Sequence, residues 1–267
     1  MKVLFITQEI APYLPETEMS TICRYLPQGI QEQGMEIRTF MPRYGCINER
    51  RNQLHEVIRL SGMNLIISDS DHPLIIKVAS IQAARMQVYF IDNDEYFSRK
   101  HTLYDDNDEY FADNDERAVF FARGVLETVR KLRWQPDVVH CHGWFTALAP
   151  LYVKKAFRED PLYSKAKVVY SIYNDGFQAP FNAEFKVKAH TDGVAQRDLL
   201  VLNKPNYFTL SKLAINFSDG FITVGDQINP AVEEYMKASN KPVMQHDPET
   251  YVKDYGAFYE KLHKNIA

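Results

Sequence analysis

The sequence predicts an α/β protein built on a doubly wound, mostly parallel sheet with helices on both faces. Continuous apolar runs at residues 2–7, 137–141 and 167–172 are typical of parallel strands that are buried on both faces. Segments with apolar residues at helical spacing alternate with such runs along most of the chain. At 267 residues, the chain has room for one large domain or two small ones.

The first elements form a strand–helix–strand unit. A strand at 2–7 is followed by a proline-containing loop and a helix at about 19–33, which we expect to end at Gly34. The next strand is expected at 36–40. This order implies two parallel strands joined by a right-handed crossover.

The middle of the chain predicts an antiparallel ribbon, because three short strands come in succession with turn residues between them. These strands are expected at 57–60, 74–79 and 87–91. The second half returns to alternation, with a loop-rich segment at 174–196. Its helices are expected at 116–132, 145–157, 204–216 and 229–237, and its strands at 137–141, 167–172 and 220–224.

The end of the chain predicts one amphipathic helix at 248–263. Its apolar residues recur at helical spacing and are Tyr251, Tyr255, Phe258, Tyr259 and Leu262. Such a stripe would promote aggregation if exposed. We therefore expect a domain at 1–245 and a C-terminal helical segment at 246–267 that packs back on it. A disordered tail is the alternative.

Composition narrows the class of protein. The net charge of −4 gives no reason to expect a nucleic-acid partner. The three cysteines are odd in number and form no CxxC pair, which favours a reducing, cytoplasmic location. No apolar run approaches the length of a membrane span, so we expect no membrane partner. Neither GxGxxG nor GxxxxGK[ST] occurs, and no cofactor is predicted.

Two histidines lie at the end of the strand expected at 137–141: His140 is inside it and His142 directly follows it. In an open α/β sheet, ligands bind outside the carboxyl ends of the strands, which makes His142 a candidate site residue. His140 is two residues earlier and is expected to be a buried structural residue. A metal site would need a third ligand at suitable spacing, and none is near in the sequence, so no metal is predicted.

Two further features leave alternatives open. The acidic run 105–109 resembles part of a calcium loop, but Tyr110 stands where the sharp turn needs glycine. A solvated acidic loop is the other interpretation. The sixteen Tyr and sixteen Phe residues indicate a packed aromatic core, with a sugar-stacking surface as the functional alternative.

Several segments of the sequence, taken together, are specific enough to indicate a protein family, although none of them is on its own. They are the opening run 2–12, the segment 42–45, the segments 88–97 and 113–121, and the strongest run, 134–146. In this order they resemble the N-terminal catalytic domain of the bacterial starch/glycogen synthase family of the ADP-glucose type. The resemblance covers nearly the whole chain.

The resemblance implies a Rossmann-like domain of a GT-B glycosyltransferase. Family members transfer glucose from ADP-glucose to the non-reducing end of an α-1,4-glucan with retention. His142 matches their active-site histidine and would be the catalytic candidate. We expect it to line the mouth of a crevice with the substrate-binding candidates Glu9 and Asn174, since all three follow strand ends; Tyr44 is the third substrate-binding candidate.

The chain also departs from the family pattern. The donor loop Lys-Thr-Gly-Gly-Leu is replaced by residues 15–19, which read Pro-Glu-Thr-Glu-Met. The phosphate-binding lysine is thus Pro15, and Glu16 and Glu18 bring two carboxylates toward a diphosphate. The His-Asp-Trp-His motif reads His-Gly-Trp-Phe from His142, and the later His-Asn motif begins with Tyr173.

These departures lead to three interpretations. The chain has about half the length of such an enzyme, so we expect a non-catalytic relative that binds α-glucan or a full-length synthase. An active glucosyltransferase assembled with a separate C-terminal domain chain is the alternative. An α/β domain with an unrelated small ligand is the third, because fold does not fix function.

Overall fold

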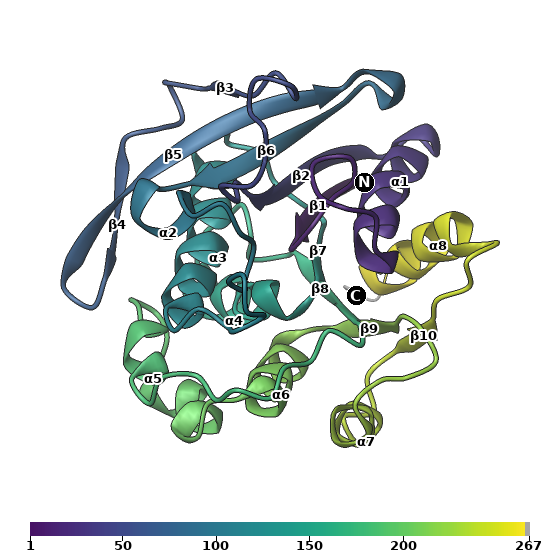
Figure 1. Ribbon diagram of the computed structural model, residues 1–267. Coiled ribbons are helices and arrows are strands. Elements are labelled where there is room, and N and C mark those ends of the chain that lie inside the picture. The colour runs from purple at the N-terminus through teal and green to yellow at the C-terminus, as the bar shows by residue number, and fades with distance from the viewer. Residues whose placement is uncertain (265–267) are drawn as a thin grey trace.

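One mixed sheet runs through the molecule in the computed structural model, which describes residues 1–264 (Figure 1). Its strands are β1 (Lys2–Thr7), β2 (Glu36–Pro42), β3 (His55–Glu56), β4 (Met63–Ile67), β5 (Ser70–Ile81), β6 (Met86–Asp92), β7 (Val138–His142), β8 (Lys167–Ile172), β9 (Gly220–Thr223) and β10 (Val243–Gln245). The order is β10-β9-β8-β7-β1-β2-β6-β5-β3, with β4 paired to β5.

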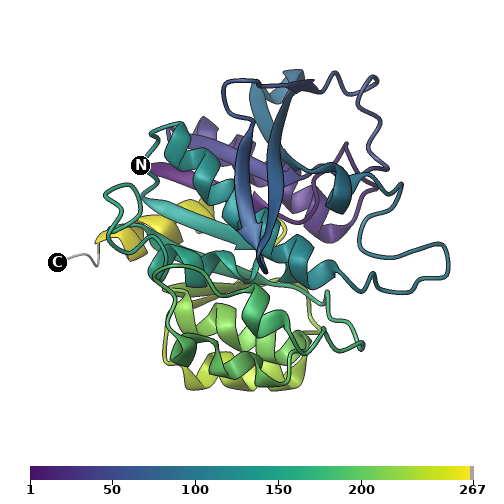
Figure 2. The same ribbon diagram turned by 90° about the vertical axis from the view of Figure 1, so that its left-hand side faces the viewer.

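The parallel part of the sheet extends from β10 to β6. β5 is antiparallel to β6 and also pairs antiparallel with β3 and β4. The predicted mostly parallel sheet is therefore confirmed, and the predicted antiparallel ribbon is confirmed for two of its three strands, which are β5 and β6. In Figure 2 the long β5 and β6 ribbon stands up from one end of the molecule.

Helices cover both faces of the sheet, as a doubly wound fold requires. They are α1 (Glu18–Glu32), α2 (Asp94–Phe97), α3 (Asn114–Lys131), α4 (Ala149–Lys154), α5 (Phe185–Lys188), α6 (Tyr207–Phe217), α7 (Pro230–Ala238) and α8 (Tyr251–Lys264), with 3-10 turns at Gln82–Ala84, Trp144–Thr146 and Gln196–Asn203. α1 and α8 lie side by side on one face, and α3, α4 and α6 cover the other (Figure 1).

In the middle of the chain one predicted strand was wrong and one hairpin was not predicted. The strand expected at 57–60 is a turn, and only the two residues of β3 before it pair with β5. The hairpin of β4 and β5 was missed. Its turn residues Ser68 and Asp69 both have positive φ, a conformation that hairpins usually assign to Asn or Gly.

The helix expected at 145–157 is interrupted. A 3-10 turn at 144–146 precedes α4, which begins with Pro150 in its first turn. Proline lacks an N–H and suits a first turn, whereas it would break the interior of a longer helix. The short β10 and the short helices α2 and α5 were not predicted, since each has too few residues to show a period.

The C-terminal helix exists and packs on the domain. Tyr255, Phe258, Tyr259 and Leu262 of α8 are buried, while Tyr251 is only partly covered. Two glycines allow this close approach: a Cβ at Gly29 of α1 would meet the Val252 side chain, and one at Gly220 of β9 would lie 2.9 Å from Phe258 Cζ. The division at residue 245 remains a prediction, and residues 265–267 lie outside the described part.

Truncation after Met244 is expected to lower the free energy of unfolding by several kcal/mol, because each large side chain that α8 buries contributes about 1.5–3 kcal/mol. Urea unfolding would measure the change. Tyr259→Ala should reproduce much of the loss, whereas Lys253→Ala, on the exposed side of α8, should change little. An unchanged midpoint for Tyr259→Ala would contradict this role of the helix.

Candidate functional site

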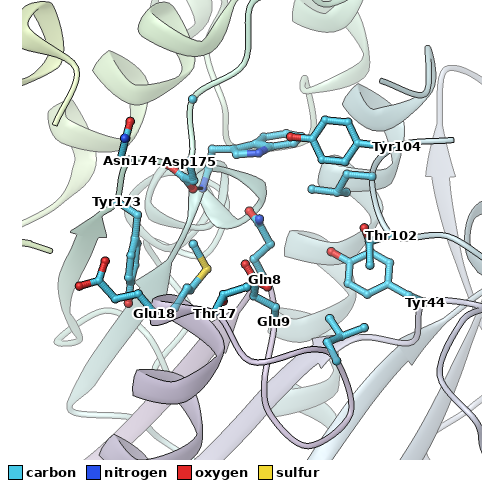
Figure 3. A pocket seen from close by; sticks show the side chains of 15 residues that line it. Gln8, Glu9, Thr17, Glu18, Tyr44, Thr102, Tyr104, Tyr173, Asn174 and Asp175 are labelled. Carbon is cyan, nitrogen blue, oxygen red and sulfur yellow. Dashed lines mark hydrogen bonds between the residues drawn. The ribbon is translucent and has the colours of Figure 1, made fainter. Parts of the chain in front are cut away.

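A cleft of about 390 Å³ opens at the carboxyl edge of the sheet (Figure 3). The loops after β1, β2, β7 and β8, the first turn of α1 and the loop between α2 and α3 supply its walls. Its lining residues are Gln8, Glu9, Leu14, Thr17, Glu18, Met19, Tyr44, Thr102, Leu103, Tyr104, Trp144, Tyr173, Asn174, Asp175 and Gly176. This is the place where open α/β sheets bind ligands.

The pairing of β1 with β7 fixes the floor of the cleft. Thr7 at the end of β1 lies opposite His142 at the end of β7, and the Gln8 N–H donates to the His142 carbonyl at 3.2 Å. The Gln8 side-chain oxygen then accepts a hydrogen bond from the Phe145 N–H at 3.1 Å. The two loops that leave these strands are thereby held together beneath the cleft.

Aromatic rings form much of the wall. Tyr44, Tyr104, Trp144 and Tyr173 all line the cleft, and Tyr104 is 37% exposed. Trp144 is held from behind by Phe177, with ring centroids 4.8 Å apart. Flat aromatic faces with a polar tip suit the apolar faces and hydroxyl rims of sugars.

The Tyr44 hydroxyl is a polar group without a partner. Tyr44 is 1% exposed, yet its Oη makes no hydrogen bond within residues 1–264. Figure 3 shows its ring directed from the end of β2 toward the middle of the cleft. The Arg117 guanidinium lies 5.8 Å from the centre of this ring, on α3. An unpaired hydroxyl costs free energy when buried, so Tyr44 is poised to bond a ligand.

Carboxylates form the opposite side. Asp175 accepts hydrogen bonds from the Trp144 N–H at 2.7 Å and the Tyr207 hydroxyl at 3.1 Å. Burial, with a smaller effect of the negative charge of Glu9, raises the pKa of Asp175 to about 6, although these hydrogen bonds lower it. Burial also raises the pKa of Glu9, and a hydrogen bond with Thr17 offsets part of that effect.

The first turn of α1 brings a third carboxylate to the cleft. Thr17 is the N-cap: its hydroxyl accepts from the Ser20 N–H at 3.0 Å, and the Ser20 hydroxyl accepts from the Thr17 N–H at 2.8 Å. Glu18 follows in the first turn and lines the cleft. This capping box consumes amide donors that an anion would otherwise use at a helix N-terminus.

The charge of the cleft is therefore negative. Three of its lining residues are acidic, and none within residues 1–264 that line it is Lys, Arg or His.

The same described range holds no group of three or more His, Cys, Asp or Glu side chains that could hold a metal ion. In the loop considered for calcium, Asp105 accepts hydrogen bonds from the Asn107 and Glu109 N–H groups and so holds its own turn.

The structure brings three predicted site residues together and places the fourth elsewhere. Glu9, Tyr44 and Asn174 line one cleft, but His142 does not line it and is fully buried. The expectation that His142 stands at the mouth was wrong. β7 extends one residue further than predicted, so that His142 pairs between β1 and β8 as part of the sheet.

Tyrosines bind both buried histidines. His142 Nδ1 is hydrogen-bonded to the hydroxyl of Tyr173 at 2.8 Å, and Tyr173 itself lines the cleft. His140 Nδ1 is bonded to Tyr259 of α8 at 2.6 Å, and its Nε2 to Ser171 at 2.7 Å. His140 therefore has a structural role, because its hydrogen bond to Tyr259 ties α8 to the sheet.

Both imidazoles are neutral in this environment. Burial, followed by the charge of His246, lowers the pKa of His142 to about 3. Burial, followed by the charge of His142, holds the pKa of His140 well below its usual value of 6.5. His142 Nε2 is buried and has no partner among the described residues. His142 is thus adjacent to the cleft but not open to a ligand.

Several residues that make the cleft lining aromatic and acidic were not identified from the sequence. Tyr104, Tyr173 and Asp175 were not predicted as site residues. Asp175 and Tyr173 carry a signal that could have been used, because they follow the strand at 167–172 as His142 follows its own. Tyr104 carries none, since its loop reaches the cleft only through tertiary packing.

Comparison with known proteins places this geometry in a class. The catalytic domain of starch synthase IV from Arabidopsis thaliana, solved bound to ADP and acarbose, superposes with a TM-score of 0.75. The match covers 91% of this chain and 50% of that one at 19% identity, and therefore concerns the fold. The fold is that of a GT-B-like glycosyltransferase domain.

The sequence comparisons then identify the family. The model of the starch synthase catalytic domain matches residues 2–238. The glycogen synthase of Chlorobium limicola is 36% identical over 174 residues, which are 65% of this chain and 36% of that protein. The glycogen synthase of Chlorobaculum parvum is 30% identical over 226 residues, and the match covers 77% of this chain and 46% of that protein. The chain belongs to the starch/glycogen synthase family and spans less than half the length of these relatives.

No helix within residues 1–264 combines the length and the apolar character needed to cross a membrane.

Acid is expected to destabilise the fold through the two buried histidines. Their folded-state pKa values lie below the usual 6.5, so the unfolded chain binds more protons and the stability they contribute is lost as pH falls below 6.5. The slope is at most about 1.4 kcal/mol per pH unit for each histidine. Asp175, with a raised pKa, opposes this loss between about pH 6 and its usual 3.8.

The comparison of variants isolates the histidine effect. His142→Gln should reduce the acid slope of the unfolding free energy by close to one proton between pH 6.5 and 4. His55→Gln, on an exposed strand end, is the matched control and should leave the slope unchanged. Equal slopes for all three proteins would contradict the assignment.

Proposed function

We propose that this chain is a saccharide-binding member of its family that takes α-glucan in the cleft and does not itself transfer glucose from ADP-glucose. The observation that carries the proposal is the composition of the cleft. Its wall combines aromatic rings with hydrogen-bonding groups and lacks the cations that a diphosphate needs. Each buried like-charge contact with a phosphate costs on the order of several kcal/mol.

The first turn of α1 argues against a nucleotide donor. Helix N-termini bind phosphate when their amides are free and their surroundings are not acidic. Here Thr17 and Ser20 cap each other, and Glu18 presents a carboxylate. These positions match the family's glycine-containing donor loop by resemblance. Pro15 occupies the place of its lysine and cannot supply the charge.

The walls favour a sugar. Tyr104 offers exposed ring surface, and Asn174 and Tyr44 bring polar groups to the same cleft. The volume of about 390 Å³ is within the range that small-molecule pockets occupy. The structural relative from Arabidopsis was solved with a saccharide ligand, acarbose, as well as ADP.

An active transferase assembled with a second polypeptide is the alternative. A companion chain could add a nucleotide-binding domain, and a full-length synthase is one such partner. The acidic residues Glu9, Glu18 and Asp175 would still line this side of the shared cleft. The sequestered His142 would also have to become accessible. Both features favour binding over transfer.

Calorimetry with the whole chain tests the proposal directly. We expect heat of binding with maltotriose and longer maltooligosaccharides, and none with ADP or ADP-glucose at millimolar concentration. A micromolar dissociation constant for ADP-glucose would overturn the non-catalytic part. Absence of binding by every maltooligosaccharide would overturn the saccharide part.

Tyr104→Ala is expected to weaken maltooligosaccharide binding roughly three- to tenfold, since an aromatic stacking contact contributes about 0.5–1.5 kcal/mol. The residue is 37% exposed, so its loss should not disturb the core. Tyr25→Ala is the matched control, because Tyr25 is 52% exposed on α1 and does not line the cleft. Equal affinities for the two variants would remove Tyr104 from the binding surface.

A further inference from the structure

We propose that the cleft selects a saccharide that carries an amino group, with the ammonium near Glu9 and Asp175, Glu18 adding to the negative charge of the cleft, and a sugar hydroxyl bonded to Tyr44. This rests on the proposed function, since it assumes that the cleft takes a saccharide, and it specifies the charge of that saccharide. The proposal is carried by three observations: uncompensated carboxylates, an unpaired hydroxyl and aromatic walls.

Within residues 1–264, the partly exposed carboxylates of the cleft have no basic partner, whereas the buried carboxylates Asp92 and Asp115 do. Asp92 is 1% exposed and has Arg43 at 2.9 Å and Lys77 at 3.0 Å. Asp115 is fully buried and has Lys188 at 2.9 Å. Each of these buried acids has a basic partner, as the cost of desolvating a charge requires.

Asp175 and Glu9 have no such partner in the part of the chain that the structure describes. Asp175 is stabilised by an amide and a phenol, and no basic side chain contributes to its pKa or to that of Glu9. The two carboxylates instead repel each other, as the effect of Glu9 on Asp175 shows. A cation from outside the chain would relieve this repulsion.

The cation that fits is an organic ammonium. A calcium ion needs six or more oxygen ligands, and within residues 1–264 no three acidic, histidine or cysteine side chains converge on a possible metal position. An ammonium accepts fewer and looser contacts, and it gains from an exposed aromatic face such as that of Tyr104. The aromatic walls therefore favour an amine over a metal ion.

Tyr44 indicates that the amine belongs to a sugar. Its hydroxyl is buried, unpartnered and directed into the cleft from the wall formed by β2, and the acidic side is formed by the loops after β1 and β8 (Figure 3). A small cation at the carboxylates would leave this hydroxyl unsatisfied. A ring that bears both an ammonium and hydroxyls can satisfy both sides of the cleft at once.

The test compares three trisaccharides by calorimetry with the whole chain at pH 7. The glucosamine trimer and cellotriose have the same linkage and differ in carrying amino or hydroxyl groups, and maltotriose tests the proposed function separately. We expect the glucosamine trimer to bind at least tenfold more tightly than cellotriose.

Charge variants show whether the effect arises in the cleft. Glu18→Gln is on the exposed first turn of α1 and should weaken binding of the glucosamine trimer severalfold. Glu159→Gln removes an equally exposed charge elsewhere and should not. Thermal unfolding of each variant checks that the fold is retained.

The outcomes separate the two proposals. If maltotriose binds and the glucosamine trimer binds no more tightly than cellotriose, the amino selectivity is wrong and saccharide binding stands. If Glu18→Gln and Glu159→Gln affect the glucosamine trimer equally, the charge effect belongs to the whole surface and the inference falls. If no trisaccharide binds, both proposals fall.

Discussion

The pairing of β1 with β7 is the contact on which the rest of the site depends. It joins two strands that are far apart in the sequence, so that the loops after both strands leave the sheet at one point. Thr7 and His142 end in register, and Gln8 then bonds to both the His142 carbonyl and the Phe145 amide. The cleft exists because the chain turns to opposite faces of the sheet on either side of this pair.

The same register explains why His142, a histidine at a strand end, is buried and does not line the cleft. A residue that pairs on both sides belongs to the sheet, and its side chain faces whatever covers that face. For His142 and His140 the cover includes α8, with Tyr259 bonded to His140. Tyr173 occupies the remaining side of His142. Burial of the two neutral imidazoles costs little free energy because tyrosine and serine hydroxyls form hydrogen bonds with three of their four nitrogens.

Much of the fold could be predicted because its signals are local. The apolar run at 2–7 and the stripe on α8 follow from residue type and period alone. The hairpin at Ser68 and Asp69 could not be predicted, because its turn uses residues without a strong preference for positive φ. In the site, Glu9 follows from its place after a strand, whereas the exclusion of His142 depends on one further residue of strand pairing, which periodicity does not determine.

Charge balance connects the packing of the chain to the chemistry of the cleft. Away from the cleft, buried carboxylates such as Asp92 and Asp115 have lysine or arginine partners, and such pairs fix elements relative to one another. At the cleft, Asp175 is positioned by donors that hold its orientation without cancelling its charge. A carboxylate oriented in this way keeps its negative charge uncompensated by any basic side chain within residues 1–264. The family resemblance explains the shape of the cleft, but its negative charge comes from this chain's own residues, and the proposed preference for a cationic ligand over a nucleotide diphosphate rests on that charge.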